Sequence, residues 1–431
     1  MDFSLDDTQR YAYDLIERTS SNVFIQGAAG TGKSVFIEYL RKHSKKKIWC
    51  LCPTGMAALN IKAQTIHHGF ALPPLDYFES DVLASSSFFN RDRNDRIRYF
   101  DVLLIDEISM VSPNLLDTID FLARKARKNN LPFGGMQVVI VGDLYQLPPV
   151  ILPETLYQYK RDYGMDKTSF YCFDSFAYKR ANFISVVFTK NYRQNSIEFI
   201  EELIKLRNGD MSCLGYFNRR LLSDAGISNT TITITPNRSK ADEINNYQLD
   251  QIDAPLKTYT GVITGKININ NLPVPTTVSL KPGALVLFCK NGHSDEIQWC
   301  NGSMGKIIEL TDDYANVYLF SQKVTIRVYK ETWTNITYKK NPKTKQMEEC
   351  ILGTYTQLPL VLGYAITIHK SQGKTLDSVK IDFDRGAWLP GQAYTALSRV
   401  RKVEDIYLTR HIYSSDIRHN DRVQKFFGAF A

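Results

Sequence analysis

One short stretch of the chain carries the residues that a nucleoside triphosphate site requires. Gly27 is followed, after four residues, by Gly32, Lys33 and Ser34. Glycines let the backbone N–H groups of such a loop wrap around phosphates, while the lysine holds the β- and γ-phosphates and the hydroxyl ligates Mg²⁺. A chance match occurs in about one of 50 chains this long, so a plain glycine turn is the weaker interpretation. The expected nucleotide-binding residues of this loop are Gly27, Ala28, Ala29, Gly30, Thr31, Gly32, Lys33 and Ser34.

A second Gly-Lys-hydroxyl sequence, Gly373-Lys374-Thr375, does not meet the same pattern. A second loop of this kind would need glycine at position 368, where the chain has Ile368. The residues therefore support one phosphate-binding loop, and the second sequence needs another explanation.

Three polar residues follow short apolar runs, at the places where buried strands are expected to end. Asp106 and Glu107 follow the run 102–105, and Gln146 comes soon after the run 138–141. An acidic residue at the end of a strand beside the phosphate loop is where a Mg²⁺ carboxylate belongs, so Asp106 is expected to hold the cation through water. Glu107 could then orient and deprotonate the attacking water. Gln146 is suited to sensing the γ-phosphate or positioning that water; the alternative is a polar turn residue.

Two arginines could stabilise the negative charge that develops on the transferred phosphoryl group. Arg193 lies in Asn191-Tyr-Arg-Gln194, and Arg399 lies in Ala396-Leu-Ser-Arg-Val-Arg401. An arginine in this role contributes about 10³ to 10⁵ in rate. Both belong to a later α/β region, so they could reach the phosphates only if that region faced the first across a cleft. Composition does not separate this role from that of an ordinary surface arginine.

Runs of apolar, β-branched residues surround these positions and predict an α/β fold. Runs without polar alternation suit strands that are buried on both faces of a parallel sheet. Helical patterns, for example at 35–41 and 115–128, lie between them and complete a βαβ series. The expected strands are 23–26, 48–52, 102–105 and 138–141 in one unit, and 184–188, 231–235, 380–383 and 406–409 in a second α/β unit.

Two other regions depart from this pattern. Between 255 and 355, short strand-like runs alternate with Gly, Asn and Pro turns, which predicts a small all-β insertion, a partly closed barrel. Residues 71–98 are poor in periodic pattern and rich in Ser, Pro, Asp and Arg. They are expected to form a small subdomain or a long loop.

The charge and cysteine content limit which partners, metal sites and cellular compartments are expected for this protein. The chain has 53 Lys and Arg against 45 Asp and Glu, and this net charge of +8 permits a polyanionic partner without requiring one. Its seven cysteines include no C-x-x-C pair, which argues against a zinc ribbon, and they fit a reducing intracellular compartment, the cytoplasm in a bacterium. No apolar run approaches the ~18 residues that span a bilayer. The acidic start of the chain differs from a mitochondrial transit peptide.

The candidate residues belong to a longer ordered series of motifs. The series comprises Leu5–Gln9, the loop 27–34, Cys52–Asn60 with Thr65–His67, Leu104–Met110, Gly142–Pro149, Thr189–Arg193, Thr235–Asn237, Gly363–Gly373 and Ala393–Arg399. In this order the chain resembles the superfamily 1 helicases, and in detail it resembles the Pif family of 5′-to-3′ DNA helicases, relatives of RecD. The stretches 107–137 and Trp299–Gly305 resemble regions that are particular to that family.

The resemblance implies two RecA-like P-loop lobes with ATP and Mg²⁺ bound between them. Gln9 would read the adenine, Ser34 and Asp106 would hold the metal, and Arg193 and Arg399 would come from the second lobe. The implied boundaries are 1–66 and 96–183 for lobe 1, 67–95 for a wedge insertion in it, 184–254 and 354–431 for lobe 2, and 255–353 for an SH3-like β-barrel insertion.

The resemblance also explains the second Gly-Lys sequence. Residues 367–375 would form the motif that links DNA to ATP, with Gly373 close to the nucleotide. Contacts to DNA phosphates would make binding tolerant of sequence and sensitive to salt. For His369 the alternative is a histidine that serves only packing. The implied nucleic-acid contacts are Thr54, Gly55, Thr65, His67, Pro236, Asn237, Thr367, His369, Lys370 and Ser371.

The expected function is an ATP-dependent 5′-to-3′ DNA helicase that is monomeric when free. Its expected partners are single-stranded and forked DNA, with G-quadruplexes and RNA–DNA hybrids as further candidates and no membrane. An RNA helicase stays open, because no residue visibly reads a 2′-hydroxyl. Two further hypotheses are a nucleic-acid-binding switch regulated by ATP, and a small-molecule kinase. Glu107, Gln146 and the two arginines argue against the switch, and a kinase would not need the second lobe.

Overall fold

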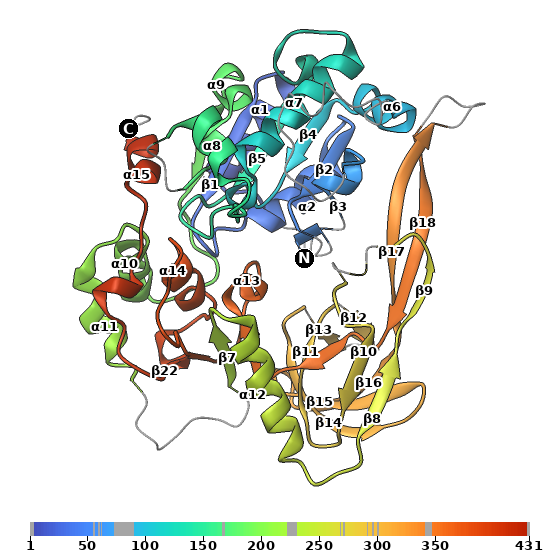
Figure 1. Ribbon diagram of the computed structural model, residues 1–431, viewed down its shortest axis with the longest axis vertical. Helices are drawn as coiled ribbons and strands as arrows, with labels where there is room; N and C mark the ends of the chain where they lie inside the picture. The colour runs from blue at the N-terminus through green and yellow to red at the C-terminus, as the bar shows by residue number, and fades with distance from the viewer. Residues whose placement is uncertain are drawn as a thin grey trace. The chain divides into compact units, whose positions relative to one another are not determined.

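The chain forms two compact units. The first comprises Met1–Tyr192, Ile336–Cys350 and Arg422–Ala431, and the second comprises Arg193–Asn335 and Ile351–Asp421. Each contains a parallel sheet with helices beside it (Figure 1). None of the described helices is long and apolar enough to cross a membrane. The computed structural model describes residues 4–54, 57–58, 61, 63–72, 90–165, 169–221, 231–267, 269, 272–290, 292–294, 297–299, 301–340 and 347–428.

Six parallel strands form the centre of the first unit. They are β1 (Val23–Gly27), β2 (Ile48–Cys52), β3 (Gln64–Thr65), β4 (Val102–Ile105), β5 (Gln137–Gly142) and β6 (Ile184–Phe188), in the order β3-β2-β4-β5-β1-β6. Nearly every residue of β1, β2, β4 and β5 is buried, as the apolar runs predict. Successive residues of a strand point to opposite faces, so Val23 and Phe24 belong to different apolar cores.

Helices supply the other half of each core. Ile16 and Ile37 pack in the core that contains Val23, whereas Leu116 packs in the core that contains Phe24. These residues come from α1, α2 and α7 respectively. The helices of the first unit are α1 (Asp7–Arg18), α2 (Lys33–His43), α4 (Ile66–Gly69), α6 (Arg91–Tyr99), α7 (Pro113–Arg127), α8 (Leu156–Tyr163), α9 (Phe176–Arg180) and α15 (Asp421–Gly428).

The position of β6 corrects the sequence analysis. The sequence predicts that the run 184–188 opens the second α/β unit, but β6 pairs in parallel with β1 of the first unit along its whole length. The chain passes to the second unit only after Tyr192. β6 is an edge strand in which only Val186 and Phe188 are buried. A short apolar run does not encode its pairing partner, so the last strand of one sheet looks like the first strand of the next.

The second unit contains a smaller parallel sheet. Its strands are β7 (Ile232–Thr235), β20 (Ala365–Thr367), β21 (Val379–Ile381) and β22 (Ile406–Leu408), in the order β20-β7-β21-β22. Three of them confirm predicted strands. No strand was predicted at β20, which lies within the motif Gly363–Gly373. The helices of this unit are α10 (Ile197–Arg207), α11 (Leu214–Asn218), α12 (Arg238–Asp250), α13 (Ile368–Ser371) and α14 (Gln392–Leu397).

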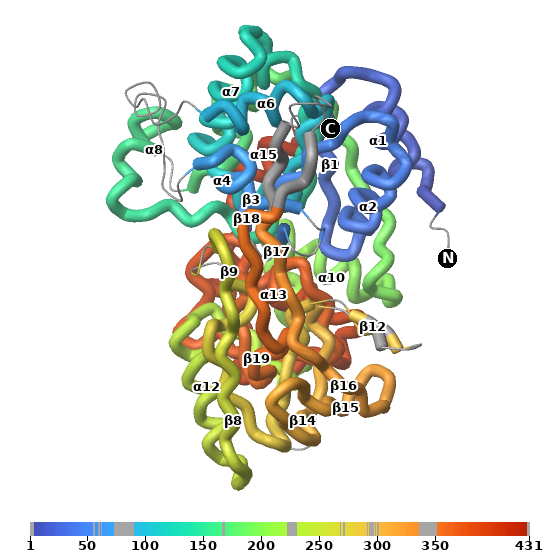
Figure 2. Tube along the Cα trace, turned by 90° about the vertical axis from the view of Figure 1, so that its right-hand side faces the viewer, coloured from blue at the N-terminus to red at the C-terminus, as the bar shows by residue number. Residues whose placement is uncertain are grey.

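The region between α12 and β20 is all-β in its described residues, as predicted. A five-stranded sheet has the order β16-β15-β14-β11-β19, and β17, β18 and β9 form a long ribbon beside it (Figure 2). Pairs β10-β8 and β12-β13 complete the region. The strands are β8 (Lys257–Thr260), β9 (Val262–Gly265), β10 (Thr277–Leu280), β11 (Leu285–Phe288), β12 (Gly292–Ser294), β13 (Ile297–Trp299), β14 (Met304–Leu310), β15 (Tyr314–Leu319), β16 (Val324–Tyr329), β17 (Glu331–Lys340), β18 (Met347–Gln357) and β19 (Leu360–Leu362).

Two smaller predictions can also be compared with the structure. Of the pattern-poor stretch 71–98, residues 73–89 lie outside the described residues, and α6 occupies most of what remains. The cysteines that the structure describes are buried, namely Cys50, Cys52, Cys172, Cys213 and Cys289.

A buried carboxylate holds the turn that leads into β5. Asp120 of α7 is 1% exposed and accepts hydrogen bonds from the Phe133 N–H at 2.6 Å, from Arg124 Nε at 2.8 Å and from Arg180 Nη2 at 2.7 Å. Phe133 has a φ of +51°, which is costly for a bulky side chain. The carboxylate therefore stabilises an unfavourable turn shortly before β5, the strand that leads to Gln146.

Substitution of Asp120 tests how much this carboxylate contributes to the free energy of unfolding. Asp120→Asn should lower the free energy of unfolding by roughly 3 kcal/mol, because the two arginines lose the charged oxygen that both contact and meet an amide NH₂ group instead. Urea unfolding followed by circular dichroism measures the change. Asp14→Asn is the control, since the Asp14–Arg18 pair lies on the exposed surface of α1 and should contribute less than about 1 kcal/mol. Equal losses in the two variants would contradict this account.

Candidate active site

The loop between β1 and α2 has the geometry of a phosphate cradle. Gly30 and Gly32 have φ values of +88° and +79°, which side chains rarely tolerate. A Cβ on Gly27 would lie 2.2 Å from Thr31 Oγ1, so this position also requires glycine. Thr31 Oγ1 donates to the Ala28 carbonyl at 2.9 Å and closes the loop on itself. The loop thereby lies at the N-terminus of α2, which favours an anion.

Lys33, the first residue of α2, lies across this loop. Its Nζ donates to the carbonyls of Gly27 at 2.8 Å and Ala28 at 2.9 Å. These bonds keep a positive charge over the loop that is predicted to hold phosphates. Ser34 follows in the first turn of α2 and is exposed. Both residues lie where the sequence predicts, and their proposed contacts stay predictions.

A buried amide group points at the same loop from α1. Gln9 is fully buried, and its Oε1 accepts from the Asp6 N–H at 3.2 Å, while the Asp6 carboxylate accepts from the Gln9 N–H at 2.8 Å. This reciprocal cap fixes the start of α1. Nε2 of Gln9 has no hydrogen-bond partner among the described residues, and it lies 3.1 Å from the position of a Cβ on Gly32. A buried donor without a partner is costly, so this atom suits a ligand at the loop.

Tyr192 is a neighbour of the loop to which the motif series assigned no role, although the residue lies inside one of its motifs. Its hydroxyl donates to Asp6 Oδ2 at 2.8 Å, and its backbone N–H donates to the Gly30 carbonyl at 2.8 Å. A Cβ on Gly32 would lie 3.3 Å from the Tyr192 ring. Tyr192 is 43% exposed, and Lys190 Nζ lies 5.1 Å from the centroid of its ring. The tyrosine is therefore a partly exposed aromatic neighbour of the loop.

The acidic pair follows β4 on a strained turn. Asp106 is 6% exposed and its Oδ1 accepts from the Glu107 N–H at 2.8 Å. Burial and the Glu107 carboxylate raise the pKa of Asp106 to about 7. Glu107 has a φ of +52°, a left-handed conformation that is costly for any residue except glycine. Gly142 permits this turn, because a Cβ there would lie 3.0 Å from the Ile108 nitrogen.

Gln146 lies in a tight turn after β5. The Asp143 carbonyl accepts from the Gln146 N–H at 3.0 Å, and Asp143 Oδ1 accepts from the Tyr145 N–H at 3.3 Å. Gln146 is 5% exposed, and its Oε1 has no hydrogen-bond partner among the described residues. The side chain is therefore held by its own turn while one polar atom stays available.

The sheet brings these residues together at the carboxyl ends of its strands. β1, β4 and β5 run parallel, with Gln26 opposite Gly142 and Ile105 opposite Ile140. Because the carboxyl ends of parallel strands lie together, the phosphate loop, the acidic pair and the Gln146 turn follow neighbouring strand ends. Among the described residues, no group of three or more His, Cys, Asp or Glu could hold a metal ion.

The two candidate arginines meet at one turn of the second unit. Arg193 Nη1 donates to the Ser398 carbonyl at 3.0 Å. Arg399 is 1% exposed, and its guanidinium donates to the carbonyls of Thr395 at 2.6 Å and Ser371 at 3.2 Å. A further bond at 3.4 Å reaches the Lys374 carbonyl. Arg399 thus braces the 371–374 loop in this conformation, which the sequence did not predict.

Residues of the 367–373 motif divide between capping and exposure. Thr367 Oγ1 accepts from the Lys370 N–H at 3.2 Å and caps α13, and the buried Ser371 hydroxyl donates to the Ile368 carbonyl at 2.8 Å. Lys370 is exposed. Burial lowers the pKa of His369, whose Nε2 has no hydrogen-bond partner among the described residues. Lys370 is therefore the exposed side chain of α13 that is best placed for an external ligand, whereas Nε2 of His369 is buried.

Lys374 answers the question raised by the second Gly-Lys sequence. It is 4% exposed, its Nζ donates to Asn301 Oδ1, and burial lowers its pKa. Gly373, with a φ of +76°, provides the turn that directs the chain inward. Lys374 is therefore an internal link between this motif and the β insertion, within the family-like stretch 299–305.

The remaining predicted nucleic-acid contacts vary in accessibility. Thr54 and Thr65 are half-buried, and each hydroxyl accepts a backbone N–H while keeping its own proton to donate. His67 is half-buried and Pro236 is buried, so the Pro236 ring is poorly placed for an external ligand. Gly55 lies outside the described residues.

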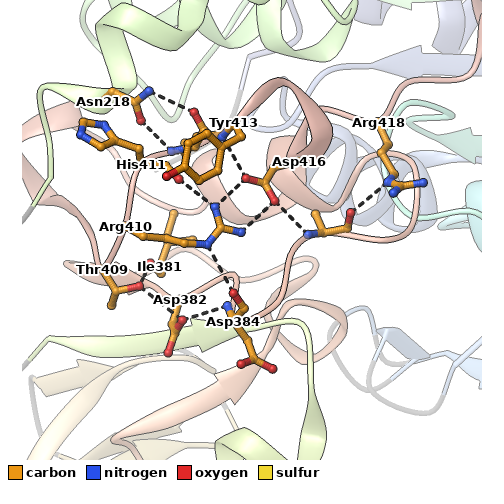
Figure 3. Close-up of polar contacts among 12 residues, drawn as sticks. Asn218, Ile381, Asp382, Asp384, Thr409, Arg410, His411, Tyr413, Asp416 and Arg418 are labelled. Carbon is orange, nitrogen blue, oxygen red and sulfur yellow. Dashed lines mark hydrogen bonds and ion pairs between the residues drawn. The ribbon is translucent and has the colours of Figure 1, made fainter.

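Asn237, the last of these contacts, is held in place by a neighbouring acid. Its Nδ2 donates to Asp384 Oδ2 at 2.9 Å. The Asp384 carbonyl accepts from Arg410 Nε at 3.3 Å (Figure 3). The Asn237 amide is therefore fixed at the start of α12, beside the end of β7.

Comparison with known proteins identifies the family. Residues 4–214 match the family model described as PIF1-like helicase. The protein is 30% identical over 416 residues to the ATP-dependent DNA helicase Pif1 of Bdellovibrio bacteriovorus, spanning 94% of this chain and 88% of that relative. It superposes on Bacteroides sp Pif1 in complex with ADP-AlF4 with a TM-score of 0.89, 32% identity and coverage of 100% of this chain and 97% of that chain. For Bacteroides Pif1 bound to ssDNA the TM-score is 0.73, at 32% identity and with coverage of 100% and 97%. These matches confirm the α/β fold of two RecA-like lobes, while the SH3-like character of the insertion stays a prediction. The chain belongs to the PIF1-like helicase family.

Proposed function

We propose that the protein is an ATP-dependent DNA helicase that moves 5′-to-3′ on single-stranded DNA. Membership of the PIF1-like helicase family supports ATP-dependent unwinding of DNA. One observation supports this assignment most directly. At the carboxyl ends of neighbouring parallel strands in the first sheet, the chain places the phosphate loop, Asp106 with Glu107, and Gln146. The direction of movement rests on the motif series alone.

ATP would be recognised by the loop and by its two neighbours. Nε2 of Gln9 would donate to an acceptor nitrogen of adenine, which recovers a hydrogen bond that the buried amide lacks. The partly exposed Tyr192 ring would pack on the base. Lys33 would exchange the carbonyls of Gly27 and Ala28 for β- and γ-phosphate oxygens.

Mg²⁺ fits the Ser34 hydroxyl and the Asp106 carboxylate, which are oxygen donors of the kind that this cation prefers. Bound there, the cation would neutralise phosphate charge as the terminal phosphoryl group leaves. The positive charge would also favour the ionised form of Asp106, whose pKa is raised by burial and by Glu107. Glu107 would accept a proton from the attacking water, and Gln146 would orient that water through its Oε1.

The second unit would contribute positive charge and grip on DNA. Arg193 and Arg399 each donate to backbone carbonyls, and on this proposal each exchanges a carbonyl for a γ-phosphate oxygen when ATP binds. Such an exchange at Arg399 would release the 371–374 loop next to His369 and Lys370. Nucleotide state would thereby alter the contacts of α13 with DNA phosphates.

The substrate range follows from the kind of contact that is available. The described candidates offer hydroxyls, one amide, two imidazoles and one exposed lysine, which suit phosphates rather than base edges. Single-stranded and forked DNA are therefore the proposed substrates of a monomeric protein. G-quadruplexes and RNA–DNA hybrids are further proposals. An RNA helicase is the outcome if RNA stimulates turnover as well as DNA does.

Two substitutions test the hydrolytic roles separately. Lys33→Ala should lower ATP turnover by about 100-fold or more, because the phosphates lose their principal cation. Glu107→Gln should lower turnover by about 100- to 10,000-fold through loss of the base, while a fluorescent ATP analogue still binds. Steady-state turnover and analogue titration measure the two effects. Retained turnover in either variant would overturn the role of that residue.

Adenine recognition by Gln9 can be tested by nucleotide selectivity. Gln9→Ala should raise KM for ATP by about 3- to 10-fold and leave KM for GTP nearly unchanged, because one hydrogen bond to adenine is lost. Arg10→Ala, at an exposed position of the same helix, is the matched control and should alter neither value. An equal rise for ATP and GTP in Gln9→Ala would rule out base reading by Gln9.

The direction of movement requires a strand-displacement assay. Duplexes with a 5′ or a 3′ single-stranded overhang are incubated with protein, ATP and Mg²⁺. Displacement is expected from the 5′ overhang and not from the 3′ overhang, and it should stop in Lys33→Ala. Displacement only from the 3′ overhang would refute the proposed polarity.

A further inference from the structure

The last described helix, α15, docks on the first unit through a group of aromatic and charged contacts. Val423 is 2% exposed in the core beneath it. The Phe426 ring stacks on Phe173, with centroids 4.4 Å apart and an interplanar angle of 13°. Arg422 pairs with Asp174 and donates to the Ser169 carbonyl at 2.5 Å. The helix is therefore a fixed part of this unit.

One residue of α15 reaches the turn that carries Gln146. The Phe427 ring stacks on Tyr145, with centroids 5.7 Å apart and an interplanar angle of 19°. The Phe427 ring centroid also lies 6.2 Å from that of Phe24 in β1. Phe427 thus bridges the strand that leads to the phosphate loop and the turn after β5. Tyr145 immediately precedes Gln146, so the stack limits how far that turn can shift.

We propose that Phe427 is a positioning residue for ATP hydrolysis, which acts by holding Tyr145 and hence the Gln146 turn beside the γ-phosphate. This inference rests on the proposed function, because it assigns Gln146 to the reacting water. Phe427 touches neither nucleotide nor metal in this account. Its effect should therefore fall on the rate of hydrolysis and not on the binding of ATP.

The residues that precede α15 are anchored in the second unit, so the chain connects this helix to both units. The Asp416 carboxylate is 1% exposed and accepts from Arg410 Nη1 and Nη2 at 2.7 and 2.8 Å (Figure 3). It also accepts from the N–H groups of Ala387 at 3.1 Å and Tyr413 at 2.9 Å. Arg418 Nε donates to the Ala387 carbonyl at 3.0 Å. The chain up to Arg418 is thereby fixed to the second unit.

A very short link joins the two anchors. Only His419, Asn420 and Asp421 separate Arg418 from Arg422, and a chain of this length spans at most about 14 Å. Displacement of the Arg418 anchor beyond that reach must pull on α15. The covalent chain therefore provides a route by which the second unit acts on the Gln146 turn.

Substitutions at the stack test the positioning role in the full-length chain. Phe427→Leu keeps an apolar side chain but removes the ring. We expect kcat for ATP with saturating oligo(dT) to fall about 3- to 10-fold, with KM for ATP unchanged, because the aromatic pair is lost. Phe427→Tyr should restore kcat. Active-site concentrations are set by titration with a fluorescent ADP analogue, so that misfolded protein does not count.

Two further variants separate positioning from general loosening of the helix. Phe426→Leu removes the stack on Phe173 without removing the ring that contacts Tyr145, and should leave kcat within about twofold of wild type. The double variant Tyr145→Leu/Phe427→Leu should be no slower than Phe427→Leu, because both changes break one contact. An unchanged kcat in Phe427→Leu, or an equal loss in Phe426→Leu, would overturn the positioning role. Absence of turnover in wild type would instead refute the proposed function.

Lengthening the link tests the route from the second unit. Insertion of Gly-Ser-Gly-Ser between Asn420 and Asp421 leaves both anchors intact but relaxes their tether. Stimulation of turnover by oligo(dT) should fall at least about threefold, while turnover without DNA stays unchanged. Full stimulation in the insertion variant would show that this tether does not transmit the effect of DNA.

Discussion

The parallel pairing of β1 with β5 is the interaction on which the proposed active site depends. Gln26 lies opposite Gly142, so the phosphate loop and the Gln146 turn begin at the same end of the sheet. The register is set by the apolar residues of β1 and β5, which pack in two cores. The polar residues of the site do not set it. Those polar residues are left under some strain: Gln9 and Gln146 each have a buried polar atom with no hydrogen-bond partner among the described residues, and Glu107 has a positive φ. Such costs persist where a ligand recovers them or where the chemistry requires the geometry.

The second unit joins its candidate ATP-facing and DNA-facing residues through backbone contacts. Arg399 holds the carbonyls of Ser371 and Lys374, and Lys374 extends this connection to Asn301 in the β insertion. The motif that begins with α13 is therefore attached to the arginine turn on one side and to the β region on the other. A change at Arg399 would be felt in both. The tether before α15 adds a covalent connection back to the Gln146 turn.

Local patterns in the sequence carried the parts of this arrangement that depend on neighbouring residues. The glycine loop 27–34, the buried strands and the polar residues at their ends follow from spacing and residue type. Pairing between distant segments left no such signal. The run 184–188 looked like a new sheet because nothing in it names β1 as its partner. The Lys374–Asn301 bond, across 73 residues, and the Phe427–Tyr145 stack depend on tertiary contacts, which neither composition nor periodicity records.

We propose that the site at the strand ends of the first unit hydrolyses ATP in response to DNA held by the same chain. The most direct measurement is the rate of ATP hydrolysis by the full-length protein, with and without single-stranded DNA, and with RNA of the same sequence. We expect slow turnover alone and strong stimulation by DNA, and equal stimulation by RNA would indicate an RNA helicase. Turnover that is the same with and without DNA would contradict the claim.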